Sequence, residues 1–342
     1  MKRDFFKAFS LCIAIIMVTS SVCFFSKKRQ IVLASETSAA KAVCVMEQSS
    51  RRILYERSGD TRLPMASTTK IATAATVLDM EKDLQEKITI PREAVGIEGS
   101  SVYLKENEEY SVQDLLYGLM LRSGNDCAVA LALNCSENLD GFCAKMNETA
   151  QRAGAFATVF KNPHGLPCKG HYTTARDLSL ISCYAMENPV FREIVATKYY
   201  EPCHWKNKNK MLTEYGGVGI KTGYTKEAGR CLVSAATREN MTVVCTVLSC
   251  PDMYAYSARL IDDAFAAYRY VKIADTTQEF TIKDGKKEVK GKLKEDFYYP
   301  MMDGEENQLE IRTKPFFDKE IVGQIEIYLS KRLLFSGNLY KL

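Results

Sequence analysis

The chain has 342 residues, more than a single hydrophobic core usually needs, and this length favours two domains. Hydrophobic residues make up 46% of the sequence and charged residues 26%, as in ordinary globular proteins. The formal net charge is only +4 and the basic residues are dispersed, so the composition argues against a nucleic-acid partner.

The N-terminus has the pattern of an export signal. Three basic residues among the first seven precede an apolar stretch at 9–25, and a small-residue cleavage site ends at Ala34. We therefore predict a signal peptide at 1–34. Basic residues at 27–29 resist export, which leaves an uncleaved membrane anchor as the alternative. In either case the rest of the chain is expected outside the cytoplasm, secreted or associated with the cell envelope.

After this segment, the first half of the chain is expected to form a hairpin and then helices. Two strand-like runs flank a polar tetrapeptide, which predicts the hairpin. Ser111 and Asp114 form a variant of the capping box at the start of one helix. The expected elements are strands at 43–46 and 53–56 and helices at 66–80, 112–121, 126–133 and 140–153.

The second half begins with a helix that Thr174 can cap and then turns to strands rich in Val, Leu, Cys and Thr. The early and late strands must share one sheet if the helical middle is to be covered on both sides. Short alternating runs after residue 272 predict a small all-β domain. The expected elements are a helix at 174–186, strands at 218–225, 230–237 and 241–249, and a helix at 254–270.

Cysteine and histidine are the residues that most often hold metals, and their pattern here does not favour a metal site. The chain has 12 cysteines without a C-x-x-C pair, and its three histidines are not at metal-ligand spacing. Most of the cysteines are expected to be small buried hydrophobic residues. We therefore predict neither a metal nor another cofactor, and assign no disulfide.

Ser67 and Lys70 form a Ser-x-x-Lys motif at the start of an expected helix. Residues three apart lie on one helical face, so the amine can reach the hydroxyl. Serine becomes a good nucleophile only when a base takes its proton. A lysine can be that base when burial or a second cation lowers its pKa. The motif alone is weak, because Ser38 and Lys41 repeat it.

Two further motifs carry groups suited to acyl transfer. In Ser123-Gly124-Asn125 the hydroxyl can pass a proton and the amide can hold a substrate backbone. Lys221-Thr222-Gly223 lies in an expected strand beside Tyr224, where lysine and threonine can bind a carboxylate and glycine permits a close backbone approach. The triplets 136–138 and 336–338 match the first pattern and are interpreted as turns or caps.

With its three motifs in this order, the chain resembles the penicillin-recognising serine acyl-transferases. It is most similar to the low-molecular-mass penicillin-binding proteins, the serine-type D-alanyl-D-alanine carboxypeptidases of peptidase family S11. This resemblance implies an α/β (α+β) transpeptidase/β-lactamase-like domain at 40–271, with an antiparallel sheet flanked by helices, and a small C-terminal all-β domain at 273–342. The stretches that carry it are 64–70, 121–126, 162–166, 171–175 and 219–225.

The resemblance also implies catalytic roles. Ser67 would attack the carbonyl between the two terminal D-alanines of a peptidoglycan stem peptide, with Lys70 as general base. Ser123 would relay the proton to the departing D-alanine, and water would hydrolyse the acyl-enzyme. A β-lactam would mimic the dipeptide and leave a slow acyl-enzyme on Ser67.

The implied binding roles fall on Asn125 and on the expected strand at 218–225. Asn125 would hold a substrate amide, and Lys221 with Thr222 would bind the terminal carboxylate. Gly223 would let the strand approach closely. The backbone N–H groups of Ser67 and Tyr224 would form the oxyanion hole.

Alternatives stay open because related enzymes also catalyse acyl transfer, and because the chain departs from the family pattern at one point. Family members commonly have an arginine near 250–255 that helps to bind the carboxylate, and this region has none here. Arg259 is the substitute that we consider. The alternatives are a β-lactamase or a D,D-endopeptidase of the same fold, or a weakly active penicillin-binding protein that binds the wall. Peripheral contact with the membrane or the cell wall is a further expectation.

Overall fold

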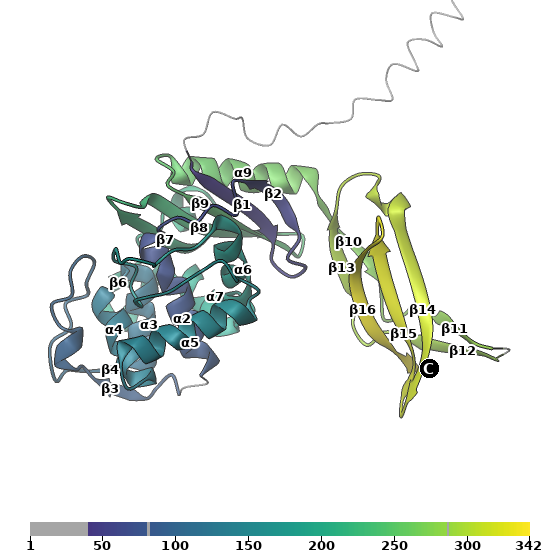
Figure 1. Cartoon of the computed structure of the whole chain (residues 1–342), viewed down its shortest axis with the longest axis horizontal. Coiled ribbons are helices and arrows are strands. Elements are labelled where there is room, and N and C mark those ends of the chain that lie inside the picture. The colour runs from purple at the N-terminus through teal and green to yellow at the C-terminus, as the bar shows by residue number, and fades with distance from the viewer. Residues whose placement is uncertain (1–39, 81–82, 286) are drawn as a thin grey trace, which may run out of the picture. The chain divides into compact units, whose positions relative to one another are not determined.

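The computed structural model describes residues 40–80, 83–285 and 287–342 (Figure 1). The predicted signal peptide at 1–34 lies outside these described residues, so its cleavage stays a prediction. Within the described ranges, none of the helices combines the length and the apolar character that crossing a bilayer requires.

A five-stranded antiparallel sheet joins the beginning and the end of the predicted catalytic region. Its order is β2-β1-β9-β8-β7, and Ala42 pairs with Leu248 although all the larger helices but one lie between them in sequence. The expectation that early and late strands share one sheet is confirmed. The strands are β1 (Ala42–Glu47), β2 (Ile53–Arg57), β7 (Val218–Thr225), β8 (Gly229–Arg238) and β9 (Met241–Leu248).

Both faces of this sheet are covered. Alternate residues of a strand point to opposite faces, and in β1 Cys44 and Met46 join one buried cluster whereas Val43 and Val45 join another. The first cluster is shared with most of the helices, and the second with the last helix, α9 (Figure 1). The fold is therefore the expected antiparallel sheet flanked by helices.

The predicted caps are present, but one expected helix is interrupted. Ser111 and Asp114 make both hydrogen bonds of the capping box, and the Thr174 hydroxyl accepts from the Asp177 amide. The helix expected at 112–121 passes instead into a π-helical turn, Gly118–Arg122. The helices are α2 (Lys70–Asp79), α3 (Val112–Tyr117), α4 (Asn125–Cys135), α5 (Leu139–Arg152), α6 (Ala175–Ala185), α7 (Pro189–Ala196), α8 (Met211–Glu214) and α9 (Met253–Ala267).

Two small two-stranded antiparallel sheets were not predicted, because short strands carry little periodic signal. They pair β3 (Lys87–Thr89) with β4 (Glu109–Ser111) and β5 (Tyr199–Tyr200) with β6 (Trp205–Lys206). The first of these sheets lies in a segment that was expected only to be polar.

The C-terminal region is all β apart from one short turn, as expected. One sheet has the order β11-β12-β16-β15-β14 and encloses its own apolar cluster, and β10 pairs with β13. The boundary predicted near residue 272 falls inside β10, and the division into domains stays a prediction. The strands are β10 (Arg269–Ala274), β11 (Phe280–Asp284), β12 (Lys287–Lys292), β13 (Phe297–Met301), β14 (Leu309–Asp318), β15 (Ile321–Leu329) and β16 (Arg332–Lys341).

Candidate active site

Ser67 lies in a tight 3-10 turn, Ala66–Thr69, that leads directly into α2. The turn begins with a strained residue, since Ala66 has a φ of 49° in the left-handed region. Gly165 makes this geometry possible because a Cβ there would lie 1.9 Å from the Ala66 carbonyl oxygen. The local backbone therefore places Ser67 in the lining of a pocket.

Lys70 is the first residue of α2 and is completely buried, with 0% of its surface exposed. Its Nζ lies 3.1 Å from Ser67 Oγ, 2.6 Å from Asn125 Oδ1 and 2.7 Å from the His164 carbonyl oxygen. Thus the amine of Lys70 has three oxygen neighbours, and one of them is the Ser67 hydroxyl.

Two physical effects favour the neutral form of this amine. Burial holds the pKa of Lys70 well below the usual lysine value, and the positive charge of Lys221 lowers it further. Asp126 and Cys127 act weakly in the opposite direction. Both effects raise the fraction of Lys70 that is neutral, and only this form can accept a proton.

Ser123 and Asn125 lie where a π-helical turn meets α4, and the Asn125 side chain hydrogen-bonds to Lys70 of α2. The π-helical turn ends at Ser123, whose φ of 65° is left-handed, and α4 then begins at Asn125. Asn125 is 3% exposed; its Oδ1 accepts from Lys70 and its Nδ2 donates to the Glu98 carbonyl. The amide of Asn125 is therefore occupied by the protein itself in this structure.

The edge strand β7 lies beside the turn that carries Ser67. Glycine at 223 leaves room for a close approach, because a Cβ there would crowd the turn at 3.0 Å from the Ser67 backbone nitrogen and 3.0 Å from the Met65 carbonyl oxygen. Lys221 is 3% exposed and donates to the Thr222 carbonyl oxygen at 3.0 Å. Burial, with a contribution from Lys208, lowers the pKa of Lys221 to about 7.

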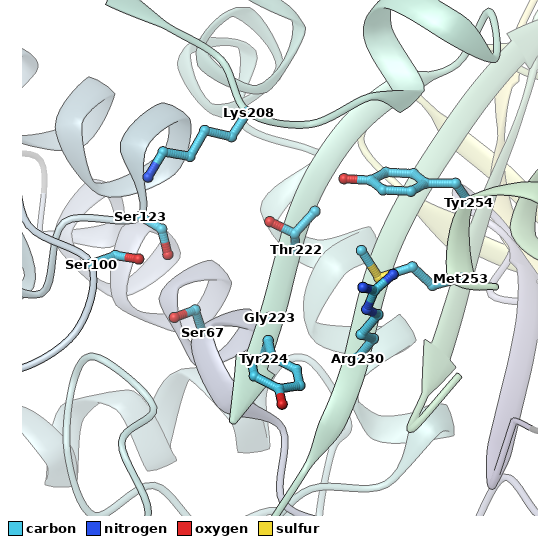
Figure 2. A pocket seen from close by; sticks show the side chains of 10 residues that line it. All are labelled: Ser67, Ser100, Ser123, Lys208, Thr222, Gly223, Tyr224, Arg230, Met253 and Tyr254. Atoms are coloured by element: carbon cyan, nitrogen blue, oxygen red, sulfur yellow. The ribbon is translucent and has the colours of Figure 1, made fainter. Parts of the chain in front are cut away.

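The turn that carries Ser67, the residue Ser123 and the strand β7 line a pocket of about 640 Å³, shown in Figure 2. The predicted residues divide into two groups. Five line the pocket, whereas Lys70, Asn125 and Lys221 are buried behind its surface. The lining residues are Ser67, Ser100, Ser123, Lys208, Thr222, Gly223, Tyr224, Arg230, Met253 and Tyr254.

Half of these lining residues were not predicted. Ser100 is held at the pocket because the backbone N–H of Asn125 donates to the Ser100 carbonyl oxygen at 2.7 Å. Met253 and Tyr254 come from the arginine-free region 250–255, and Arg259 is not among the residues that line the pocket. No local motif marks Ser100, Lys208 or Arg230. Met253 and Tyr254, in contrast, lie in the region where the family resemblance had placed a carboxylate-binding arginine.

A buried histidine supports the turn that carries Ser67. His171 Nδ1 accepts from the Lys161 amide at 3.0 Å, so its Nε2 carries the proton and donates to Thr69 Oγ1 at 2.8 Å. The Thr69 hydroxyl in turn donates to the strained Ala66 carbonyl at 2.9 Å. This chain of hydrogen bonds requires neutral His171, and burial lowers the pKa of His171 to about 4.

This arrangement predicts a loss of stability in mild acid. Burial also lowers the pKa of His164 to about 4, with a smaller effect of Lys70, whereas an unfolded histidine titrates near pH 6.5. Between these values the unfolded chain binds more protons than the folded one, so the free energy of unfolding should fall as pH is lowered from about 6.5 to about 4. The expected loss is up to roughly 3 kcal/mol per histidine.

Urea unfolding measured across this pH range tests the prediction. The variant His171→Gln should remove about half of the pH dependence. The matched control His204→Gln, in an exposed turn, should leave it intact. A free energy of unfolding that stays constant between pH 6.5 and 4.5 contradicts the prediction.

Comparison with known proteins gives one consistent family. The family model described as D-alanyl-D-alanine carboxypeptidase, peptidase S11, matches residues 28–252. The D-alanyl-D-alanine carboxypeptidase DacF of Bacillus subtilis is 32% identical over 298 residues, which cover 81% of this chain and 76% of DacF. The D-alanyl-D-alanine carboxypeptidase of Streptomyces sp. K15 is 36% identical over 257 residues, covering 67% and 88% of the two chains.

Solved structures agree with this result. Penicillin binding protein 5 of Haemophilus influenzae superposes with a TM-score of 0.76 at 27% identity, covering 90% of this chain and 97% of that protein. The Streptomyces K15 DD-transpeptidase superposes with a TM-score of 0.64 at 36% identity, covering 67% of this chain and 98% of the transpeptidase chain. The expected penicillin-binding-protein fold is confirmed.

Proposed function

The chain belongs to the D-alanyl-D-alanine carboxypeptidase family of serine peptidases, and we propose that it removes the terminal D-alanine from peptidoglycan stem peptides through an acyl-enzyme on Ser67. The observation that carries this proposal is the buried Lys70 amine 3.1 Å from the Ser67 hydroxyl. The reaction would take place outside the cytoplasm, where peptidoglycan and the proposed exported chain would meet.

The hydrogen bonds of Lys70 support its role as general base. A neutral amine has two N–H groups and one lone pair. Asn125 Oδ1 and the His164 carbonyl are acceptors only, so they take the two N–H groups. The lone pair is then left for the proton of Ser67 Oγ, the third neighbour. Asn125 is accordingly proposed to orient Lys70, in addition to any contact with substrate.

Acylation would then proceed as follows. Ser67 Oγ bonds to the carbonyl carbon of the penultimate D-alanine while its proton moves to Lys70 Nζ. The C–N bond to the last D-alanine then breaks as the nitrogen takes the proton of the Ser123 hydroxyl, which lines the same pocket and regains a proton from Lys70. Water then hydrolyses the ester and regenerates Ser67.

The close approach of β7 to the Ser67 turn supports an oxyanion hole. The backbone N–H groups of Ser67 and Tyr224 would stabilise the negative charge that develops on the carbonyl oxygen. Gly223 favours this approach, since a Cβ there would lie only 3.0 Å from backbone atoms of the turn. Thr222, beside buried Lys221, would contact the terminal carboxylate.

Product analysis tests the proposed function. The purified chain is expected to release one D-alanine from each pentapeptide ending in D-Ala-D-Ala, and to be labelled stoichiometrically by a fluorescent penicillin. Rapid penicillin turnover without D-alanine release would identify a β-lactamase instead. Labelling without cleavage of the pentapeptide would identify a penicillin-binding wall module.

Cleavage of cross-linked dimeric peptides without release of D-alanine would identify a D,D-endopeptidase. A β-lactam that labels the chain should also block D-alanine release, because both reactions would use the same serine. Separate inhibition of the two reactions would contradict the proposal.

A further inference from the structure

Arg230 is a cation in the pocket that the three motifs do not include. It is the second residue of β8 and pairs directly with Tyr224 of β7. Directly paired residues have side chains on the same face of a sheet, and so do residues two apart on one strand. Arg230, Tyr224 and Thr222 therefore share a face, and all three line the pocket (Figure 2).

The guanidinium of Arg230 has no acidic partner among the described residues. Its one hydrogen bond there is a long one, from Nη1 to the Pro251 carbonyl oxygen at 3.5 Å. Met253 and Tyr254 line the pocket beside Arg230, and neither side chain carries a negative charge at neutral pH. Arg230 therefore keeps most of its five N–H donors for a ligand.

The two lysines of the site are less suitable as a permanent counterion. Burial lowers the pKa of Lys221 to about 7, so this amine is only partly charged at neutral pH, and its Nζ already donates to the Thr222 carbonyl. Burial and the charge of Arg122 also lower the pKa of Lys208. An arginine side chain, in contrast, stays protonated under all conditions in which proteins fold.

We propose that Arg230, together with the Thr222 hydroxyl, makes this enzyme specific for substrates with a free C-terminal carboxylate. The inference rests on the proposed function and assigns its specificity to a residue outside the three motifs. The fork of a guanidinium suits bidentate binding of a carboxylate. Thr222 pairs with Leu232, two residues beyond Arg230 on β8, so the hydroxyl and the guanidinium lie diagonally across two neighbouring strands.

A pair of substrates separates this role from a general effect on activity. The first is a diacyl-L-Lys-D-Ala-D-Ala tripeptide, and the second is the same peptide with a C-terminal carboxamide. Both present the same scissile bond to Ser67, but only the first carries the negative charge. The ratio of their kcat/KM values therefore measures recognition of the carboxylate.

In the full-length chain, Arg230→Ala is expected to lower kcat/KM for the acid by about 10- to 100-fold, since it removes a charge-assisted hydrogen bond. The same variant should change kcat/KM for the amide by less than about 2-fold. Arg230→Gln, which keeps most of the side-chain volume, should behave in the same way, and Arg230→Lys should recover part of the loss. Arg238→Ala is the matched control, at the far end of β8 and paired with Asp262.

Three results would overturn the inference. An equal loss with both substrates in Arg230→Ala and Arg230→Gln would show a structural role. A collapse of the acid preference in Lys208→Ala, but not in Arg230→Ala, would assign the carboxylate to Lys208. If the unmodified chain cleaves neither substrate, the proposed function itself fails and this inference fails with it, an outcome that the first two results cannot imitate.

Discussion

Replacing Ser67 with alanine is expected to abolish both penicillin labelling and D-alanine release. The variant loses the oxygen that would form the acyl bond, and among the described residues no other hydroxyl hydrogen-bonds to the Lys70 amine. Loss of the nucleophile from a serine peptidase lowers kcat by a factor on the order of 10⁶. Labelling with fluorescent penicillin and mass spectrometry of the intact adduct measure the effect.

The control for this experiment is Ser38→Ala, which removes the serine of the second Ser-x-x-Lys motif in the sequence. It should be labelled like the unmodified chain. The fold should survive in Ser67→Ala, because the hydroxyl faces a pocket and its loss leaves no buried cavity. Undiminished labelling of Ser67→Ala would rule out Ser67 as the nucleophile.

Replacing Lys70 with methionine is expected to slow acylation by about 10²- to 10⁴-fold, the usual contribution of a general base. Methionine fills much of the same space but has no lone pair able to take the Ser67 proton. Folding should be preserved, because the substitution removes a side chain whose charged form is strongly disfavoured by burial. The second-order rate constant for penicillin acylation measures the effect.

The pH dependence of acylation gives an independent test of Lys70. Its amine acts as a base only when neutral, and the neutral fraction falls as pH drops through its lowered pKa. Acylation should therefore slow as the pH is lowered, and this dependence should be absent from the residual rate of Lys70→Met. Lys70→Arg, which keeps a positive charge and cannot act as a base, should be as inactive as the methionine variant. An active Lys70→Arg would show that only the charge matters.

Local patterns predicted the parts of this protein that depend on near neighbours in sequence. The capping box at Ser111, the cap at Thr174 and the late strands are set by spacings of two to four residues, and the structure confirms them. The proximity of Ser67 and Lys70 is of the same kind, because residues three apart must be neighbours in a helical turn.

Tertiary structure decided the chemical state of these groups. Lys70 is a credible base because Asn125 and the His164 carbonyl surround it, 55 and 94 residues away in sequence. The π-helical turn before Ser123 and the use of the Asn125 amide within the protein were not predicted either. Desolvation and charge–charge effects act through space, so no local spacing reveals them.

The arginine that lines the pocket was also decided by tertiary structure and not by local sequence. From sequence order we considered Arg259, because it lies near the arginine-free region that follows β9. The structure brings Arg230 to the pocket instead, since strand pairing sets it opposite Tyr224. Sequence by itself determined the reactive groups and their order along the chain. Only the pairing of distant strands and the burial of Lys70 and Lys221 decided which groups meet and which carry charge.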